Sequence, residues 1–390
     1  MGTEQREADF DILIQGAGIG GLTLAIALQQ RGYSVKIVER SETLSEVGAG
    51  IWMAANPMQV FDQLGIAENV TAAGWMVKRL RLQDYRGFDI QVTDMSAVAK
   101  LFGFETVALH RSVLQKVLFE QLPADTVLFG TEVKALSQDK ESVSVQLADG
   151  SRVRARVVVG ADGINSRIRS HLSLGGEKRY SGYSSYRAIA KRARLLPAES
   201  DHEAYEIWGE GCRVGFSKIN ADDYYWYMTF DSPAGETRSV EQMRSHAGSL
   251  FKTFFPQWGG LLEYTSPEEI LRTDISDLKP LKKWSSGRVG LIGDAAHATT
   301  PNLGQGGAMA VEDALALAKS FQEVGLSEAA FERFEQRRRD KVNWAVSTSW
   351  TIGKMCHIKN PIVRSLRNAV LMYSPKSVSR KQIVKLYSIG

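Results

Sequence analysis

The first stretch with chemical meaning is Gly16-Ala17-Gly18-Ile19-Gly20-Gly21, which follows a short apolar run and precedes a helical pattern. Glycines at its first, third and sixth positions let the backbone turn sharply and approach a pyrophosphate, which then lies at the positive N-terminus of the helix. Glu39, at the end of the next predicted strand, is positioned to accept hydrogen bonds from a ribose. Together these residues predict dinucleotide binding, without saying which dinucleotide is bound.

Two later motifs place an aspartate among glycines. Residues 160–169 follow a predicted strand and open a helix, although an isolated Asp-Gly pair such as Asp162-Gly163 is usually only a turn. The third motif begins at Gly293-Asp294 and continues through the glycines of residues 301–307. Asp294 can form hydrogen bonds with the ribityl or pyrophosphate oxygens of a flavin. The glycines expose backbone N–H groups at a helix start, where negative charge on a reduced flavin ring is favoured.

These motifs need a sheet that brings them to one place. The expected strands span residues 10–15, 34–39, 143–147, 152–158 and 287–294, with helices from the glycine turn to about residue 31 and over residues 308–319. The first two strands and their helix form a βαβ unit, and Ala148-Asp149-Gly150 predicts a hairpin turn. Because the last strand comes so late, the first domain is discontinuous in sequence.

A second kind of sequence lies between these parts. From Tyr180 to about Asp274 the chain alternates in strand fashion and is rich in aromatic residues, as in residues 224–230, and it lacks a glycine-rich nucleotide signature. This pattern predicts an antiparallel sheet with a separate task. The fold class is therefore α/β with an added antiparallel-sheet domain.

The composition narrows the chemistry further. The chain has 390 residues, 44% hydrophobic and 24% charged, which suits a globular protein with a large core. Its two cysteines and six histidines show neither a disulfide framework nor a metal-ligand spacing, so redox chemistry must come from an organic cofactor. The sequence lacks an apolar stretch of about 20 residues, and residues 1–7 lack the order of a signal peptide, so we expect a cytoplasmic protein. We expect no nucleic-acid partner, because no recognition motif is present.

The end of the chain is unusual in charge. Residues 341–390 contain nine Lys and Arg and no Asp or Glu, together with apolar residues such as Trp344, Ile362 and Leu366. Such a segment could contact an anionic membrane surface weakly. It could equally be a helix that packs on its own domain and exposes a solvated basic face. Both interpretations stay open at this stage, as does the oligomeric state.

The three motifs, in this order, resemble the class A single-component FAD-dependent aromatic hydroxylases, a family of flavoprotein monooxygenases, over roughly residues 9–340. The resemblance is nearest to hydroxylases of urate, 6-hydroxynicotinate, salicylate and 3-hydroxybenzoate, and more distant to zeaxanthin epoxidase. It implies a glutathione-reductase-like, Rossmann-type FAD-binding domain with a substrate sheet above the flavin and a C-terminal helical tail. It also implies hydroxylation of a small aromatic or heteroaromatic substrate with O2 and NADH or NADPH, through a flavin C4a-hydroperoxide.

The resemblance also implies domain boundaries and residue roles. The FAD-binding domain would take residues 1–75, 104–178 and 275–340, the substrate domain residues 76–103 and 179–274, and the basic helical segment residues 341–390. Asp162 is expected to serve both FAD and NAD(P)H, with Arg169 as a further candidate. Two departures are Ala308, where many relatives have Asn, and Asn56-Pro57, where they have Pro-Asn. The expected FAD-binding residues are Gly16, Gly18, Gly21, Glu39, Arg40, Arg111, Asp162, Asp294, Gly304, Gly306 and Gly307.

For the substrate, the resemblance to urate hydroxylases points to Arg213 and Tyr225 as catalytic residues. Arg213 would hold an anion, and Tyr225 would polarise or deprotonate the ring, unless the first pairs with an acid and the second fills the core. Arg187 is a further candidate. His110 and His297 are expected to be structural. Four aromatic residues could line a substrate pocket or belong to the core: Tyr186, Trp208, Phe216 and Trp226.

Two other functions remain compatible with the sequence. One is an epoxidase or hydroxylase of a larger lipophilic substrate at a membrane surface, which would use the basic tail. The other is a flavin-binding redox protein without oxygenase activity. Stimulation of NAD(P)H consumption by a substrate separates the second from the oxygenases.

Overall fold

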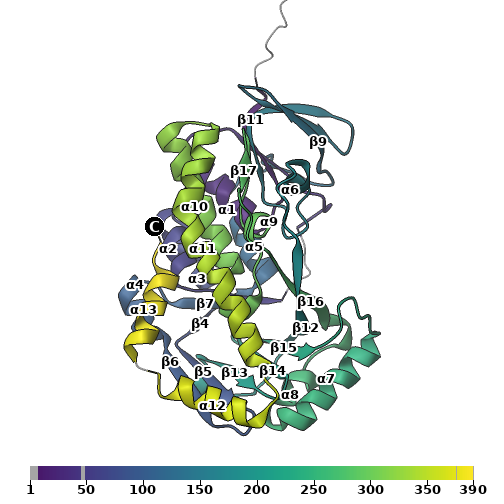
Figure 1. Cartoon of the computed structure of the whole chain (residues 1–390), viewed down its shortest axis with the longest axis vertical. Coiled ribbons are helices and arrows are strands. Elements are labelled where there is room, and N and C mark those ends of the chain that lie inside the picture. The colour runs from purple at the N-terminus through teal and green to yellow at the C-terminus, as the bar shows by residue number, and fades with distance from the viewer. Residues whose placement is uncertain (1–7, 45–48, 375, 390) are drawn as a thin grey trace, which may run out of the picture.

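The computed structural model describes residues 8–44, 49–374 and 376–389. The opening residues 1–7, on which the signal-peptide prediction rests, lie outside this range. The upper half of the molecule in Figure 1 is built around an eight-stranded sheet whose main path runs β17-β18-β11-β1-β2-β8. The strands of this sheet are β1 (Phe10–Gln15), β2 (Val35–Val38), β8 (Val127–Leu128), β9 (Val133–Gln138), β10 (Val143–Leu147), β11 (Arg152–Gly160), β17 (Ser285–Ser286) and β18 (Val289–Leu291).

Parallel pairing explains why the three motifs meet. β1 lies between β2 and β11, β11 pairs with β18, and all three pairings are parallel. The strands therefore end at the same edge of the sheet, where ligands bind in α/β folds. Gln15 pairs with Gly160, and Gly160 with Leu291, so the motifs begin side by side.

The lower half of the molecule is a seven-stranded sheet of order β16-β12-β15-β14-β13-β5-β6. All its neighbours are antiparallel except β13 and β5. Two of its strands come from an earlier part of the chain than the predicted sheet of residues 180–274. Its strands are β5 (Arg79–Asp84), β6 (Asp89–Asp94), β12 (Lys178–Ala190), β13 (Glu203–Trp208), β14 (Cys212–Lys218), β15 (Tyr224–Asp231) and β16 (Leu271–Leu278).

Residues 180–274 are not all strand. The helices α7 (Val240–Phe254) and α8 (Gly260–Glu263) interrupt this range and cover one face of the lower sheet. Ser239 begins α7 with a capping box to Gln242, which satisfies two N–H groups at the helix end. The opposite face turns toward a small sheet of β3 (Gly50–Met53), β4 (Trp75–Val77) and β7 (Thr106–His110).

Long helices hold the two halves together. α10 continues from the third motif, and α11 then runs along both sheets in Figure 1 before α12 crosses the lower end of the molecule. The remaining helices pack around the sheets or connect the strands. The helices include α1 (Ile19–Gln29), α2 (Ala55–Gln63), α3 (Ala67–Ala72), α4 (Met95–Phe102), α5 (Arg111–Phe119), α6 (Arg167–His171), α9 (Asp294–His297), α10 (Gly306–Val324), α11 (Glu328–Cys356), α12 (Pro361–Met372) and α13 (Lys376–Tyr387).

The predicted fold class is confirmed, with shifted element ends. The strand expected over residues 287–294 is the short β18, and the helix expected over residues 308–319 is the longer α10. The hairpin of β10 and β11 forms at the predicted turn. Across the described ranges, no helix combines the length and the apolar character needed to cross a membrane.

Candidate active site

The glycine turn has a different constraint at each of its three predicted glycines. Gly16 has φ +108°, and a Cβ there would lie 2.6 Å from the Ala161 oxygen, so the second motif packs directly on the first. A Cβ on Gly21 would lie 2.0 Å from the Gly16 oxygen, which makes this glycine necessary for the turn itself. A Cβ on Gly18 would meet no atom within 4 Å. Gly18 thus borders open space, as expected where a pyrophosphate approaches the backbone.

The start of α1 suits an anion. Gly18 is the N-cap, no side chain caps the helix, and no acidic residue lies in its first turn. Its backbone N–H groups are therefore available beside the positive end of the helix dipole.

Glu39 and Gln115 fix the turn from opposite sides. A Glu39 carboxylate oxygen accepts a hydrogen bond of 2.8 Å from the Ala17 N–H, and the Gln115 amide donates one of 2.7 Å to the Ala17 oxygen. Arg40 is exposed beside Glu39. Gln115 could not be predicted from the sequence, because its partner lies 98 positions earlier in the chain.

The second motif is tied to the third by a buried arginine. Asp162 accepts hydrogen bonds from the N–H groups of Arg167 and Ile168 through one carboxylate oxygen. Its other oxygen is buried and finds no hydrogen-bond partner among the described residues, so it can still accept one. The guanidinium of Arg169 donates to the backbone oxygens of Ile164 and Ala295. Arg169 therefore positions the two loops relative to each other.

Asp294 has an exposed side chain that is nevertheless surrounded by protein atoms. Its side chain is exposed, yet burial raises the pKa of its carboxyl group, while the nearby charges of His297 and Arg111 lower it. Both properties fit a group that lines a cleft and is surrounded by protein. Arg111, exposed at the start of α5, thus lies close enough to Asp294 to interact electrostatically.

The glycines that follow Asp294 border the same region. Gly304 has φ +62°, in the left-handed region that favours glycine. A Cβ on Gly306 would lie 3.8 Å from a carboxylate oxygen of Asp294, and one on Gly307 would lie 2.9 Å from the Ile51 Cδ1 atom. Side chains at these positions would narrow the space between β3 and the start of α10.

A buried cluster of charges fixes the third motif. Asp313 accepts hydrogen bonds from the Gly293 N–H, from His297 at 2.6 Å and from the Arg338 Nε at 2.8 Å. Burial raises the pKa of Asp313, but the charges of His297 and Arg338 outweigh it and bring the pKa to about 2. His297 is thus a structural residue, as expected. Asp313 and its neighbour Glu312 stand as acids within the apolar run of α10, a signal that buried cations would be found opposite them.

Glu312 extends this cluster toward the N-terminal part of the chain. It pairs with Arg338 and with Lys341, and it accepts a hydrogen bond of 2.6 Å from the Asn56 amide. Asn56 also donates to Gln305, at the N-cap of α10. The Asn56-Pro57 departure therefore lies at the support of the third motif.

The residues around this cleft fit an FAD molecule. Gly18 leaves space for a pyrophosphate, the start of α1 has free N–H groups, and one Asp162 oxygen lacks a partner. Asp294 and Arg111 interact electrostatically in the same region. The individual contacts to FAD remain predictions.

Arg213 is not a free cation on the substrate sheet. It is 1% exposed, and its guanidinium pairs with Glu206 at 2.9 Å. It also donates to Thr229, to the Cys356 sulfur and to Asn302. Asn302 belongs to the third motif, so Arg213 links the substrate sheet to the loop that follows Asp294. Burial alone would lower the pKa of Arg213, but its partners, Glu206 first among them, raise it well above the usual value.

Tyr225 and its neighbours form the face of the sheet that packs on β3. A Cβ on Gly50 of β3 would lie 2.2 Å from the Tyr225 ring, so the ring packs closely on that strand. Tyr225 keeps some accessible surface, although burial raises its pKa to about 12. Arg187 lies close enough to Tyr225 to lower this pKa in part, and its Nε finds no hydrogen-bond partner within the described part of the chain.

Three residues complete this face, and two of them, Tyr227 and Trp52, were not predicted from the sequence. Tyr227 donates its hydroxyl to Glu206, and Trp208 donates its indole N–H to the same carboxylate at 2.5 Å. The third, Trp52 of β3, donates to Ser217 at 3.0 Å. Glu206 could have been suspected from the alternation of β13, because an acid there shares a sheet face with Trp208.

Most of the aromatic residues proposed as a pocket wall belong to the core instead. Tyr186, Phe216 and Trp226 lie on the opposite face of the sheet, where they pack against α7 and α8. The alternation of a strand sends successive side chains to opposite faces, so Tyr225 and Tyr227 face the cleft while Trp226 faces the helices. Trp208 packs with Ile90 and Cys356 near α12.

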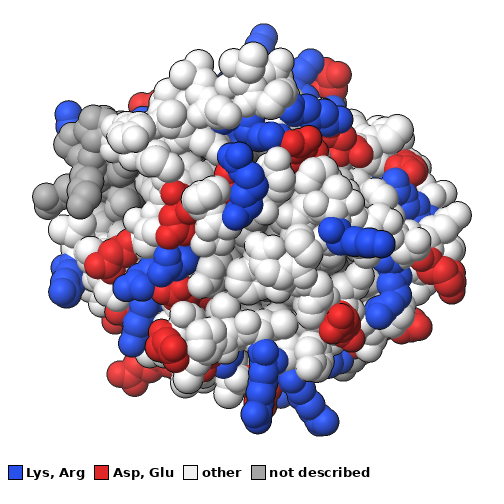
Figure 2. All heavy atoms as spheres, turned by 90° about the horizontal axis from the view of Figure 1, so that it is seen from below, with Lys and Arg blue, Asp and Glu red and all other residues white. Residues whose placement is uncertain are grey.

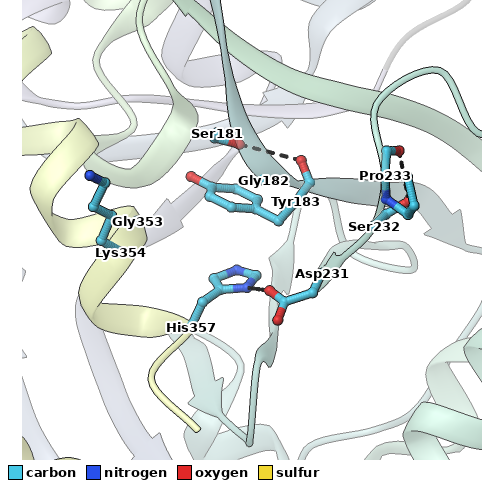
Figure 3. Close-up of a pocket in the computed structure, with 9 residues that line it drawn as sticks. All are labelled: Ser181, Gly182, Tyr183, Asp231, Ser232, Pro233, Gly353, Lys354 and His357. Carbon is cyan, nitrogen blue, oxygen red and sulfur yellow. Dashed lines mark hydrogen bonds and ion pairs between the residues drawn. The ribbon is translucent and has the colours of Figure 1, made fainter.

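A cavity of about 560 Å³ lies beside this network, at the junction of β12, β15 and the end of α11 (Figure 3). His357 stacks on Tyr183 with ring centres 4.2 Å apart and interacts with Asp231 at 2.7 Å. His357 also contacts Thr229, a partner of Arg213. None of the predicted FAD-binding residues lines this cavity.

A dinucleotide turn, two aspartate loops at one sheet edge and a separate substrate sheet together define a flavoprotein with a dedicated substrate domain. The family described as "FAD binding domain" matches residues 9–349. The aurachin C monooxygenase/isomerase of Stigmatella aurantiaca is 35% identical over 92% of this chain and 93% of its own length. The 2-heptyl-3-hydroxy-4(1H)-quinolone synthase of Pseudomonas aeruginosa is 31% identical over 97% of each chain.

A solved structure agrees with these relatives. A Klebsiella pneumoniae protein in complex with FAD and uric acid superposes with a TM-score of 0.89 and 25% identity, covering 99% of this chain and 98% of the other. The chain therefore belongs to this family, and it is an FAD-dependent monooxygenase that uses NAD(P)H. The resemblance stated from the motifs is confirmed.

The glycine geometry makes a paired prediction. Gly21→Ala should destabilise the fold by about 1–3 kcal/mol or more, because its Cβ would overlap backbone. Gly18→Ala should fold normally, since its backbone suits alanine, but should bind FAD about tenfold more weakly if the Cβ takes space needed by the pyrophosphate. Thermal unfolding of the apoprotein and FAD titration separate the two effects. Equal FAD affinity of Gly18→Ala and the wild type would contradict the assignment.

Asp294 provides a second test. Asp294→Ala should lose most of its flavin during purification, while Asp222→Ala, an exposed aspartate in the loop between β14 and β15, should keep it. The ratio of flavin absorbance to protein absorbance measures the difference. Full flavin content in Asp294→Ala would remove Asp294 from the site.

Proposed function

We propose that this monooxygenase hydroxylates an uncharged, lipophilic heteroaromatic molecule of the 4-quinolone kind. The observation that carries the proposal is the pairing of Arg213 with Glu206, which neutralises the cation expected to hold an anionic substrate. The relatives named for aurachin C and for an alkylquinolone support this substrate class.

The two phenols of this face, Tyr225 and Tyr227, favour a neutral ring, whereas Arg187 retains its positive charge beside them. Tyr225 stays protonated at neutral pH, because burial raises its pKa to about 12, so it can donate a hydrogen bond to a ring oxygen but is a poor base. Burial and Glu206 hold the pKa of Tyr227 well above its usual value. We therefore assign Tyr225 a polarising role. Arg187 is the cation of this face with donor capacity to spare.

The cofactor roles follow from the cleft. We propose that Gly16, Gly18, Gly21, Glu39 and Arg40 hold the ADP half of FAD, and that Arg111, Asp162 and Asp294 hold the rest with the glycines of the third motif. Bound FAD supplies the electrons taken from NAD(P)H and the activation of O2. The contribution of the protein is to orient the substrate ring on Tyr225 and to exclude water with Trp52 and the neighbouring apolar residues.

The division of labour between the sheets follows the predicted domains. We propose that the eight-stranded sheet and its helices bind the cofactor and the seven-stranded sheet binds the substrate. The cytoplasm is the compartment we propose, since NAD(P)H is available there. A lipophilic substrate dissolves mainly in membranes, so a weak membrane contact of the basic C-terminal segment would bring the enzyme to it.

The substrate class can be tested with a panel. The FAD-loaded enzyme should consume NAD(P)H faster with a 2-alkyl-4-quinolone than with urate or 3-hydroxybenzoate, by at least about tenfold in kcat/KM. Product analysis should show one added oxygen atom, and little peroxide should accumulate. A preference for urate or 3-hydroxybenzoate would overturn the proposed substrate class. The quinolone assignment would also be wrong if no compound of the panel stimulated NAD(P)H consumption.

Glu206→Gln tests the neutralised arginine. Removing the carboxylate charge leaves Arg213 uncompensated, so the preference for 3-hydroxybenzoate relative to the quinolone should rise about tenfold, corresponding to ~1.4 kcal/mol. Glu210→Gln is the matched control, because Glu210 pairs with Arg364 on the outside of the sheet. An unchanged ratio in Glu206→Gln, with FAD still bound and the melting temperature retained, would refute the role of this pair.

A further inference from the structure

Helix α12 turns its charged side inward and its aliphatic side outward. Four of its apolar residues and the residue that follows the helix share one arc, because steps of about 100° per residue bring positions 362, 363, 366, 370 and 373 to one side. All five are exposed: Ile362 78%, Val363 47%, Leu366 65%, Val370 60% and Tyr373 81%. A surface helix usually shows the reverse orientation.

The inward side explains why the helix is held this way. Arg364 pairs with Glu210 at 2.7 Å, and the Arg367 guanidinium lies 4.4 Å from the centre of the Trp208 ring. Arg367 also donates to the Met355 oxygen at 2.6 Å, and Leu371 joins the Trp208 cluster. Since both arginines have partners in the body of the protein, α12 cannot simply rotate to bury its aliphatic side.

One more exposed apolar residue, outside α12, lies at the same end of the molecule. Phe88, 64% exposed, sits in the turn between β5 and β6, the strand on which α12 packs. Arg364 lies over the Tyr85 ring at 5.2 Å, which joins this turn to α12. We call the six residues Ile362, Val363, Leu366, Val370, Tyr373 and Phe88 the apolar ridge.

The surroundings of the ridge favour an anionic partner. The nearby acids Glu210 and Asp84 are already paired, with Arg364 and Arg86. The segment from residue 341 onward has no acid at all, and Lys354, Lys381 and Lys385 are exposed on it. Figure 2, which views this end of the molecule, shows a broad uncharged centre with charged residues of both signs toward its margin.

We propose that the apolar ridge docks on the surface of an anionic phospholipid bilayer. A single helix with protruding aliphatic side chains can enter the headgroup region of a bilayer, with Tyr373 at the polar boundary, and the basic C-terminal segment is attracted to anionic lipid. On its inner side α12 contacts Trp208, which donates to Glu206 of the substrate face. Docking therefore brings the substrate sheet close to the membrane. The inference deepens the proposed lipophilic substrate but is testable without it.

The test is co-sedimentation of the FAD-loaded full-length protein with vesicles. Wild-type protein should bind vesicles of equal parts phosphatidylglycerol and phosphatidylcholine at least about tenfold more tightly than vesicles of phosphatidylcholine alone, and 0.5 M salt should weaken this binding. Leu366→Glu should lose at least about tenfold in binding. The matched control is Val324→Glu at the end of α10, which also replaces an exposed aliphatic residue, 39% exposed, and should bind like wild type.

The other outcomes overturn the proposal. Absence of wild-type binding to both vesicles, or equal binding of Leu366→Glu and wild type, would show that the ridge does not dock on lipid. A wild-type dimer that Leu366→Glu converts to a monomer, without vesicle binding, would make the ridge an interface between two copies of the chain. Flavin content and quinolone-stimulated NAD(P)H consumption in detergent-free solution, measured on the same samples, report on the proposed function separately.

Discussion

The cleft depends on one buried carboxylate. The Asp313 carboxylate interacts with the Gly293 N–H, the His297 ring and the Arg338 guanidinium. These hydrogen bonds join the third motif to α10 and α11. A buried charge without partners would be costly, so the cations and the N–H are required wherever this aspartate is buried. Because the loop after β18 is fixed in this way, Asp294 lies at the same sheet edge as the glycine turn and Asp162. That arrangement brings the three motifs together at one sheet edge.

The substrate sheet also contains a buried charged side chain with an oppositely charged partner. Arg213 is buried, so it needs a carboxylate, and Glu206 provides it from the neighbouring strand. Glu206 accepts hydrogen bonds from Tyr227 and Trp208, and Arg213 donates one to Asn302 in the loop that follows Asp294. The arginine at this position is thus neutralised by a carboxylate of the same sheet. The partner of the arginine, rather than the arginine itself, sets the electrostatic character of the face.

The C-terminal segment shows how packing of charges can expose apolar surface. α11 and the inner side of α12 pack on the protein, as the packing interpretation of the basic tail predicts, whereas the outer side of α12 is aliphatic and exposed, and its membrane contact stays a prediction. The arginines of α12 are held by Glu210 and Trp208, which fixes the direction in which the helix faces.

The sequence by itself determined the three motifs, the βαβ opening, the hairpin at Asp149 and the fold class. Each of these depends on local requirements, such as a glycine at the sharp turn of Gly16 or a two-residue alternation in a strand. Only the tertiary structure decided that Tyr225 packs on β3 while Trp226 faces α7, and that Glu206 neutralises Arg213. Alternation separates two faces without saying which layer each one meets. The partners of a buried charge can come from anywhere along the chain, as Arg338 and Asp313 do, and no local pattern specifies them.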